Sequence, residues 1–122
     1  MDITRSNEDY LEAIMQNERD GSAKSVDVAT TLHVSKAAVS IAMNDLAAKG
    51  LIEKESYGGI VLTERGREVA SSTLSKHRLI RRFLIGIGVT EGTAEVECCK
   101  IEHILSEETV DRLSDFCKKN HF

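Results

Sequence analysis

Residues 35–63 read SKAAVSIAMNDLAAKGLIEKESYGGIVLT, and the spacing of their apolar side chains changes once along the segment. Up to Lys49 the apolar residues recur at helical spacing, behind a good capping residue, Ser35. Gly50 stands where a helix needs a left-handed terminator. The segment therefore begins with a predicted helix that ends near Lys49.

A β-hairpin is predicted after this helix. Residues 51–55 and 60–62 are short strand candidates, and the turn signal Ser56-Tyr57-Gly58-Gly59 lies between them. A helix, a short turn, a second helix and a hairpin form the plan of a winged helix-turn-helix domain. The sequence predicts that plan here, provided that another helix precedes Ser35.

Two helices are predicted before Ser35. The first begins near Ser6, with Asn7 on its polar side and an apolar side made of Tyr10, Leu11, Ile14 and Met15. The second extends to Leu32, with Ser25 as its expected cap. The DNA-binding domain predicted from these elements covers residues 1–75.

Three helices are predicted after the hairpin, which makes the fold mainly α. The first is capped by Thr63 and runs to about Ile87, and the others cover residues 93–105 and 106–119, followed by a frayed tail. At 1.5 Å per residue the long helix measures about 37 Å, too long for so small a domain to cover. We therefore expect a helical dimerisation domain over residues 76–122.

Composition excludes several classes of function. The chain of 122 residues has 16 Lys and Arg against 20 Asp and Glu, a net charge of −4, so DNA binding must rest on a few placed contacts. No apolar run reaches the ~18 residues of a membrane span, and no signal peptide is recognisable. Three cysteines form no disulfide framework. We expect a cytoplasmic protein with reduced thiols.

Side chains that could bind a metal ion are concentrated near residue 100. On a helix, Cys99, Glu102 and His103 share one face, and their sulfur, oxygen and nitrogen donors fill about half the coordination sphere of a divalent transition ion. Asp9 and Glu12 repeat the spacing of three on the first helix, whereas His77 interrupts an apolar stripe. These six residues are the candidate ligands.

Simpler interpretations exist for each candidate. Asp9 could complete a capping box with Ser6, and Glu12 could be an ordinary solvated residue. His77 could be a polar residue at a dimer interface, and Cys99 a small buried side chain. Three further residues are expected in packing or surface roles: Cys98, Cys117 and His33.

Four segments of the sequence resemble the DtxR/MntR family of metal-dependent repressors: EDYLEAI at 8–14, VSKAAVS at 34–40, YGGIVLTERG at 57–66 and IEHILS at 101–106. The resemblance implies a winged-helix domain and a helical dimerisation domain with metal bound between them. It implies a homodimer on palindromic double-stranded operator DNA, in a short form without the SH3-like C-terminal domain of longer relatives.

The resemblance places the six candidates, Asp9, Glu12, His77, Cys99, Glu102 and His103, on the family's ligand positions. The first two are similar to the manganese-sensing branch, whereas Cys99 is similar to the iron-sensing branch. A thiolate favours Fe(II), so we expect Fe(II) first and Mn(II) second, with other divalent transition metals possible in vitro. At Arg81 and Glu95 the ancillary site of the iron branch is not fully reproduced.

The DNA-facing residues are expected on the second helix of the motif and on the wing. In the family a polar residue at the position of Ile41 often contacts the DNA bases, so the resemblance implies fewer base contacts here. The predicted DNA-binding residues are Ser35, Lys36, Ala37, Ser40, Asn44, Tyr57 and Gly58.

Two other functions would explain part of the sequence. A MarR-type regulator, controlled by a small organic ligand or by thiol oxidation, would explain the wing, the long helix and the adjacent cysteines. It would leave the carboxylates of Asp9 and Glu12 unexplained. A hydrolase using Cys99 and His103 would need a closed pocket and a glycine loop for an oxyanion. We therefore expect a regulator and not an enzyme.

Overall fold

A computed structural model describes residues 2–122 and divides the chain into two compact units, one ending at Ser71 and the other beginning at Ser72. Helix α4 (Glu64–Gly86) contributes residues to both. No helix within residues 2–122 is both long and apolar enough to cross a membrane.

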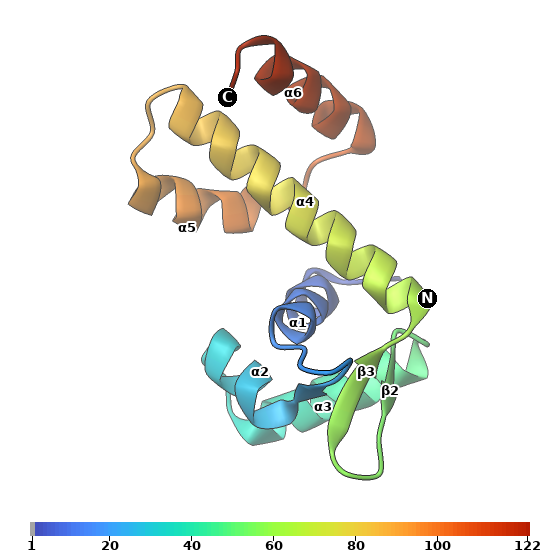
Figure 1. Cartoon of the computed structure of the whole chain (residues 1–122). Coiled ribbons are helices and arrows are strands. Elements are labelled where there is room, and N and C mark those ends of the chain that lie inside the picture. The colour runs from blue at the N-terminus through green and yellow to red at the C-terminus, as the bar shows by residue number, and fades with distance from the viewer. Residues whose placement is uncertain (1) are drawn as a thin grey trace. The chain divides into compact units, whose positions relative to one another are not determined.

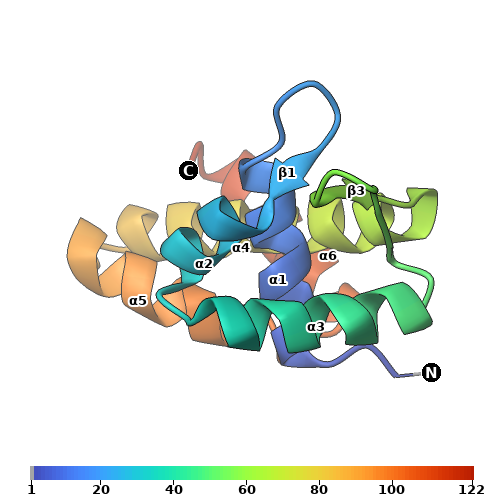
Figure 2. The same cartoon turned by 90° about the horizontal axis from the view of Figure 1, so that it is seen from below.

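The N-terminal unit is a winged helix-turn-helix domain, as predicted (Figure 1). Figure 2 shows α3 running across α1, and the two helices are in contact. Before α4 the unit contains α1 (Arg5–Gln16), β1 (Ala23–Lys24), α2 (Ser25–Leu32), α3 (Lys36–Ala48), β2 (Ile52–Lys54) and β3 (Gly59–Leu62).

Helix α1 begins at Arg5, close to the predicted start near Ser6, and its cap is Thr4. The Thr4 hydroxyl accepts a hydrogen bond from the Asn7 amide at 3.1 Å, and the Asn7 side chain accepts one from the Thr4 amide at 3.0 Å. This reciprocal pair is a capping box. The alternative capping box of Ser6 with Asp9 is therefore wrong.

Asn7 is buried, although the sequence predicted it on the polar side of α1. Its amide nitrogen donates to Asp45 at 2.8 Å, and its amide oxygen accepts from the Lys49 ammonium at 2.7 Å. The hydrogen bond from Asn7 and a weaker contribution from Lys49 lower the pKa of the Asp45 carboxyl. One buried amide thus fixes α1 against α3.

The helices of the helix-turn-helix motif begin and end at or next to the predicted residues, except that Ser25 is not the cap of α2. Lys24 and not Ser25 precedes α2, without a side-chain cap, because the chain enters the helix directly from β1. His33 ends α2 in the left-handed conformation, with φ of 56°. Ser35 caps α3 by accepting from the Ala38 amide at 3.1 Å, and Gly50 follows the helix with φ of 73°.

The wing is the predicted hairpin with one additional strand. Strands β2 and β3 pair antiparallel with Ile52 opposite Leu62, and Gly58 takes a φ of 85° in the turn. Strand β1, which was not predicted, pairs with the other edge of β3 and gives the order β1-β3-β2. A strand of two residues is too short to show alternation.

The apolar sides of these elements form one core. It contains residues from α1, α2, α3, the sheet and the start of α4, among them Leu11, Ile14, Val28, Val39, Leu46, Leu51, Ile60 and Ala70. Thr63 caps α4 as predicted, since its hydroxyl accepts from the Gly66 amide at 3.1 Å. The core thereby fixes α3 and the wing, which carry the predicted DNA-facing residues.

The C-terminal unit consists of the remainder of α4, α5 (Glu91–Ile101) and α6 (Glu107–Lys119), with α5 and α6 flanking α4 (Figure 1). The prediction of a helix over 93–105 is wrong at both ends. Thr90 precedes the first turn of α5, and the Ile104 amide bonds to the Ile101 carbonyl at 3.0 Å, which tightens the chain into a turn.

The last three residues are ordered, so the predicted frayed tail is wrong. The Phe122 amide donates to the Cys117 carbonyl at 2.9 Å. Its ring lies 5.8 Å from that of Phe116 and 6.5 Å from that of Phe83, between ring centres. Gly86 makes room for this ring, because a Cβ there would lie 2.5 Å from it. Cys117 is buried, as predicted.

Candidate functional site

His77 on α4 is the centre of a polar cluster in the C-terminal unit. Its Nδ1 atom lies 2.8 Å from Oε2 of Glu102, and its Nε2 atom lies 3.1 Å from Oε1 of Glu95. Both ring nitrogens therefore face carboxylate oxygens. Each of these contacts requires a proton or a cation between the nitrogen and the oxygen, because both atoms are otherwise acceptors.

Both cysteines of α5 reach the same imidazole. The Cys98 sulfur lies 3.5 Å from Nδ1 of His77, and the Cys99 sulfur lies 3.9 Å from it. The possible ligand atoms of His77, Glu95, Cys98 and Cys99 all lie within 4.8 Å of one another. Cys98, which was expected to serve in packing, therefore belongs to this cluster, and only its position next to Cys99 in the sequence could have indicated it.

Cys98 is completely buried, and its environment favours the thiol over the thiolate. Burial, and to a smaller extent the neighbouring Cys99, Glu95 and Glu102, together raise the pKa of the Cys98 thiol to about 12. As a thiol, Cys98 donates to the Glu95 carbonyl at 3.3 Å. Only a strong electrophile such as a metal ion would make this sulfur a thiolate near neutral pH.

Arg81 and Glu95 form the outer part of the cluster. The Arg81 Nε atom donates to Oε2 of Glu95 at 3.0 Å, while the other oxygen of Glu95 contacts His77. The guanidinium is thus a fixed positive charge beside the carboxylate. This pair occupies the two positions that the sequence analysis found to depart from the ancillary site of the iron branch.

Glu102 and His103 follow directly after α5 in the turn. Glu102 is 3% exposed, and its Oε1 atom lies 3.4 Å from Nε2 of His103. Both residues were predicted to lie on the helix, but α5 ends at Ile101. The structure still brings Glu102 together with His77, because the Glu102 backbone continues in the helical region, with φ of −56°.

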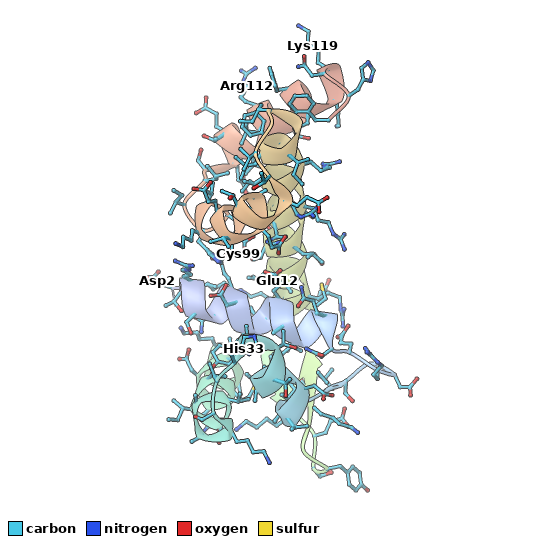
Figure 3. The ribbon with its side chains drawn as sticks, turned by 90° about the vertical axis from the view of Figure 1, so that its left-hand side faces the viewer. Asp2, Glu12, His33, Cys99, Arg112 and Lys119 are labelled. Atoms are coloured by element: carbon cyan, nitrogen blue, oxygen red, sulfur yellow. The ribbon has the colours of Figure 1, made fainter. Side chains whose placement is uncertain are left out.

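Asp9 and Glu12 lie on α1 in the N-terminal unit. Asp9 is half-buried, with a carboxylate oxygen 4.0 Å from Nε of Arg5. Glu12 accepts a hydrogen bond from the Gln16 amide at 3.4 Å. Figure 3 labels Glu12 on α1 and Cys99 on α5. Of the six predicted ligands, the C-terminal unit by itself brings together four: His77, Cys99, Glu102 and His103.

The donor set of the C-terminal unit fits a divalent transition ion. It combines imidazole nitrogen, thiol sulfur and carboxylate oxygen, and a buried carboxylate such as that of Glu102 is costly without a positive partner. Thiol and imidazole together are the ligands of later first-row ions, whereas magnesium and calcium sites are built from oxygen.

The predicted DNA-binding residues all lie on the surface of the N-terminal unit. Ser35, Lys36, Ala37, Ser40 and Asn44 are exposed at or along α3, and Tyr57 at the tip of the wing is 95% exposed. Lys54 of β2 bonds to Asn44 and was missed by the sequence analysis. A groove between α3 and the wing is lined by residues that include Lys36, Ser40, Lys54 and Gly58.

Two family models match this chain over almost its whole length. Residues 2–60 match the iron dependent repressor, N-terminal DNA binding domain. Residues 63–122 match the iron dependent repressor, metal binding and dimerisation domain. The alternative of a MarR-type regulator is not supported, since both models describe iron-dependent repressors.

Individual relatives agree with these models. An uncharacterized HTH-type transcriptional regulator of Methanocaldococcus jannaschii is 39% identical over 96% of each chain. The regulator MntR of Bacillus subtilis is 35% identical over 92% of this chain and 80% of its own. The structure of the manganese regulator SloR is 34% identical with a TM-score of 0.81 over 97% of this chain, which spans 55% of SloR.

Proposed function

Because the chain belongs to the DtxR/MntR family of metal-dependent transcriptional repressors, we propose that it binds operator DNA as a homodimer when activated by Fe(II), with Mn(II) as second candidate. The observation that carries this proposal is the His77 imidazole, which meets sulfur and carboxylate donors from a single unit. In this proposal residues 1–75 form the DNA-binding domain, and residues 76–122 bind metal and dimerise.

The proposed ligands come from both halves of the chain. His77, Cys99, Glu102 and His103 belong to the C-terminal unit, where the contacts described above support them. Asp9 and Glu12 are proposed from their match to the family's ligand positions. The candidate ligands are thus Asp9, Glu12, His77, Cys99, Glu102 and His103.

The carboxylates explain how metal and DNA binding are coupled. When bound, a divalent ion supplies the positive charge that offsets Asp9, Glu12 and Glu102. Without that charge, repulsion among the three carboxylates loosens the first helix from the dimerisation helices. With the repulsion offset, the dimer holds its two recognition helices at a spacing that suits successive major grooves, about 34 Å apart.

Operator binding is assigned to α3 and the wing. The exposed residues of α3 reach phosphates and base edges, with the Ser35 amide at the helix start attracting a phosphate. Tyr57 and Gly58 contact the flanking backbone. The exposed side of α3 carries a single cation, Lys36, and the net charge of the whole chain is −4. Affinity therefore depends on placed contacts and not on a general positive field.

The homodimer is assigned to the C-terminal unit. This unit leaves several large apolar side chains exposed, which is typical of a surface that pairs with another chain. They are Ile87, Val96, Ile104 and Phe116, with exposed fractions of 55%, 59%, 79% and 45%. A second copy of the chain, seated on this surface, would present two recognition helices to a palindromic operator.

The order of metals follows from the ligand chemistry. Mn(II) prefers hard oxygen donors, whereas a thiolate and an imidazole favour later ions such as Fe(II). Cys99 and His77 are therefore the residues that place Fe(II) before Mn(II). Mn(II) is the second candidate, because carboxylates are good ligands for either ion.

An anaerobic operator-binding titration across divalent metals at buffered free concentrations tests the proposal. We expect a chelator to abolish binding and Fe(II) to restore it at a lower free concentration than Mn(II). Glu12→Ala and Cys99→Ala should weaken activation, while Glu97→Ala, which removes an exposed carboxylate of α5, should leave it unchanged. Operator binding that is indifferent to chelation would overturn the proposal.

A further inference from the structure

Cys98 lies inside the cluster around His77. Its sulfur is 3.5 Å from Nδ1 and 3.6 Å from Nε2 of the imidazole, and the residue is completely buried. Cys99 approaches the same Nδ1 atom to 3.9 Å. Two thiols thus meet one imidazole nitrogen, an arrangement that apolar packing does not require.

The distances between these donors are suited to one shared ion. A tetrahedral zinc site has sulfur at about 2.3 Å and nitrogen at about 2.0–2.1 Å from the metal, which separates the two ligand atoms by about 3.5 Å. The distances from Nδ1 to the two sulfurs, 3.5 and 3.9 Å, lie close to this value. A single ion could therefore bind both sulfurs after small side-chain movements.

The partners of His77 determine which ring nitrogen binds. Nε2 faces Glu95 at 3.1 Å, and Arg81 holds the other oxygen of that carboxylate at 3.0 Å. A carboxylate that accepts the Nε2 hydrogen fixes the tautomer and leaves the Nδ1 lone pair for a metal. Nδ1 is also the nitrogen that lies 2.8 Å from Glu102.

We propose that Cys98 and Cys99 both bind the activating ion as thiolates, together with Nδ1 of His77. This inference rests on the proposed function in taking the ion to be the repressor's activator. Each thiol releases its proton to solvent when its sulfur binds. Two thiolates select Fe(II), Co(II) or Zn(II) over Mn(II), which makes Cys98 a residue that determines metal specificity.

Anaerobic titration of the full chain with Co(II) tests the second thiolate, because sulfur-to-Co(II) charge transfer gives an ultraviolet absorption. The intensity should fall by about half in Cys98→Ser, since one of two thiolates is lost. Cys117→Ser is the matched control, a buried cysteine on α6, and should keep the full intensity. Full intensity in Cys98→Ser would overturn the proposal.

X-ray absorption of the Zn(II)-loaded wild-type protein gives the same answer without any substitution. The proposal expects two sulfur atoms at about 2.3 Å from the metal. One sulfur atom would overturn it, whatever the behaviour of the variants.

These outcomes are distinguishable from a failure of the proposed function. Two bound sulfurs in a protein whose operator binding ignores metal would leave this inference standing and overturn the proposed function. A single sulfur in a protein whose operator binding requires metal would do the opposite.

Discussion

The Nδ1 atom of His77 lies 2.8 Å from Oε2 of Glu102, and Glu102 is only 3% exposed. Burying a carboxylate is costly unless a positive partner compensates for the lost hydration. The pair joins α4 to the turn that follows α5. It therefore contributes both to the packing of the C-terminal unit and to its proposed metal binding.

Glu102→Gln should weaken metal binding by at least roughly tenfold, because the amide has nearly the same size but no negative charge. Competition with a fluorescent chelator measures the affinity. Glu97→Gln makes the same change on the exposed side of α5 and should have no effect. Equal losses in the two variants would mean that overall charge, and not the position of Glu102, determines the affinity.

In the metal-free protein, iodoacetamide should label Cys99 before Cys98 near neutral pH. The thiolate is the reactive form, and burial raises the pKa of Cys98 to about 12. Because this folded pKa lies above the ordinary value of 9.0, the stability due to the neutral thiol is complete below pH 9.0 and is lost as the pH rises toward 12. Fragmentation mass spectrometry distinguishes the adjacent sites, and equal labelling would contradict the burial of Cys98.

Gly66→Ala should destabilise the N-terminal unit by about 1–3 kcal/mol, because a Cβ at this position would collide with the carbonyl oxygen of Leu51. Gly92→Ala is the matched control on α5, where a Cβ meets nothing within 4 Å. That change should stabilise the protein by up to about 1 kcal/mol through helix propensity. Urea unfolding measures both, and a neutral Gly66→Ala would contradict the described packing of α4.

Lys36→Ala should weaken binding to matched and mismatched operators about equally and reduce the slope of affinity against salt by about 1, as expected for a phosphate contact. Fluorescence anisotropy at several salt concentrations measures the slope. Lys119→Ala, at the end of α6 (Figure 3), removes the same charge far from α3 in the sequence and should leave the slope unchanged. An unchanged slope in Lys36→Ala would exclude that contact.

The sequence predicted the elements whose signals are local. Ser35, Gly50 and the turn at Gly58 act through their own backbone conformations, so the helix and hairpin were predicted correctly. The capping residue of α1 was not predicted, because Thr4 and Ser6 are both plausible caps. Tertiary hydrogen bonds of Asn7, which donates to Asp45 and accepts from Lys49, accompany the Thr4 cap, and these partners lie 38 and 42 residues away along the chain.

Part of the candidate site could also be predicted, because three of its residues lie close together in the sequence. The spacing of Cys99, Glu102 and His103 indicated a half-site within one segment, and the structure brings Cys99 and Glu102 to His77. Cys98 was missed because its contact with His77 depends on how α5 packs against α4. Adjacent helical residues point about 100° apart, so spacing alone placed only one of the two sulfurs toward the site.

The coupling between metal and operator binding tests the central claim most directly. If one conformational equilibrium links the two sites, each ligand must strengthen the binding of the other by the same factor. Anaerobic Fe(II) affinity measured with and without an operator duplex should differ by roughly 5- to 150-fold, and operator affinity should change by the same factor on metal loading. Equal Fe(II) affinities with and without the duplex would contradict the account.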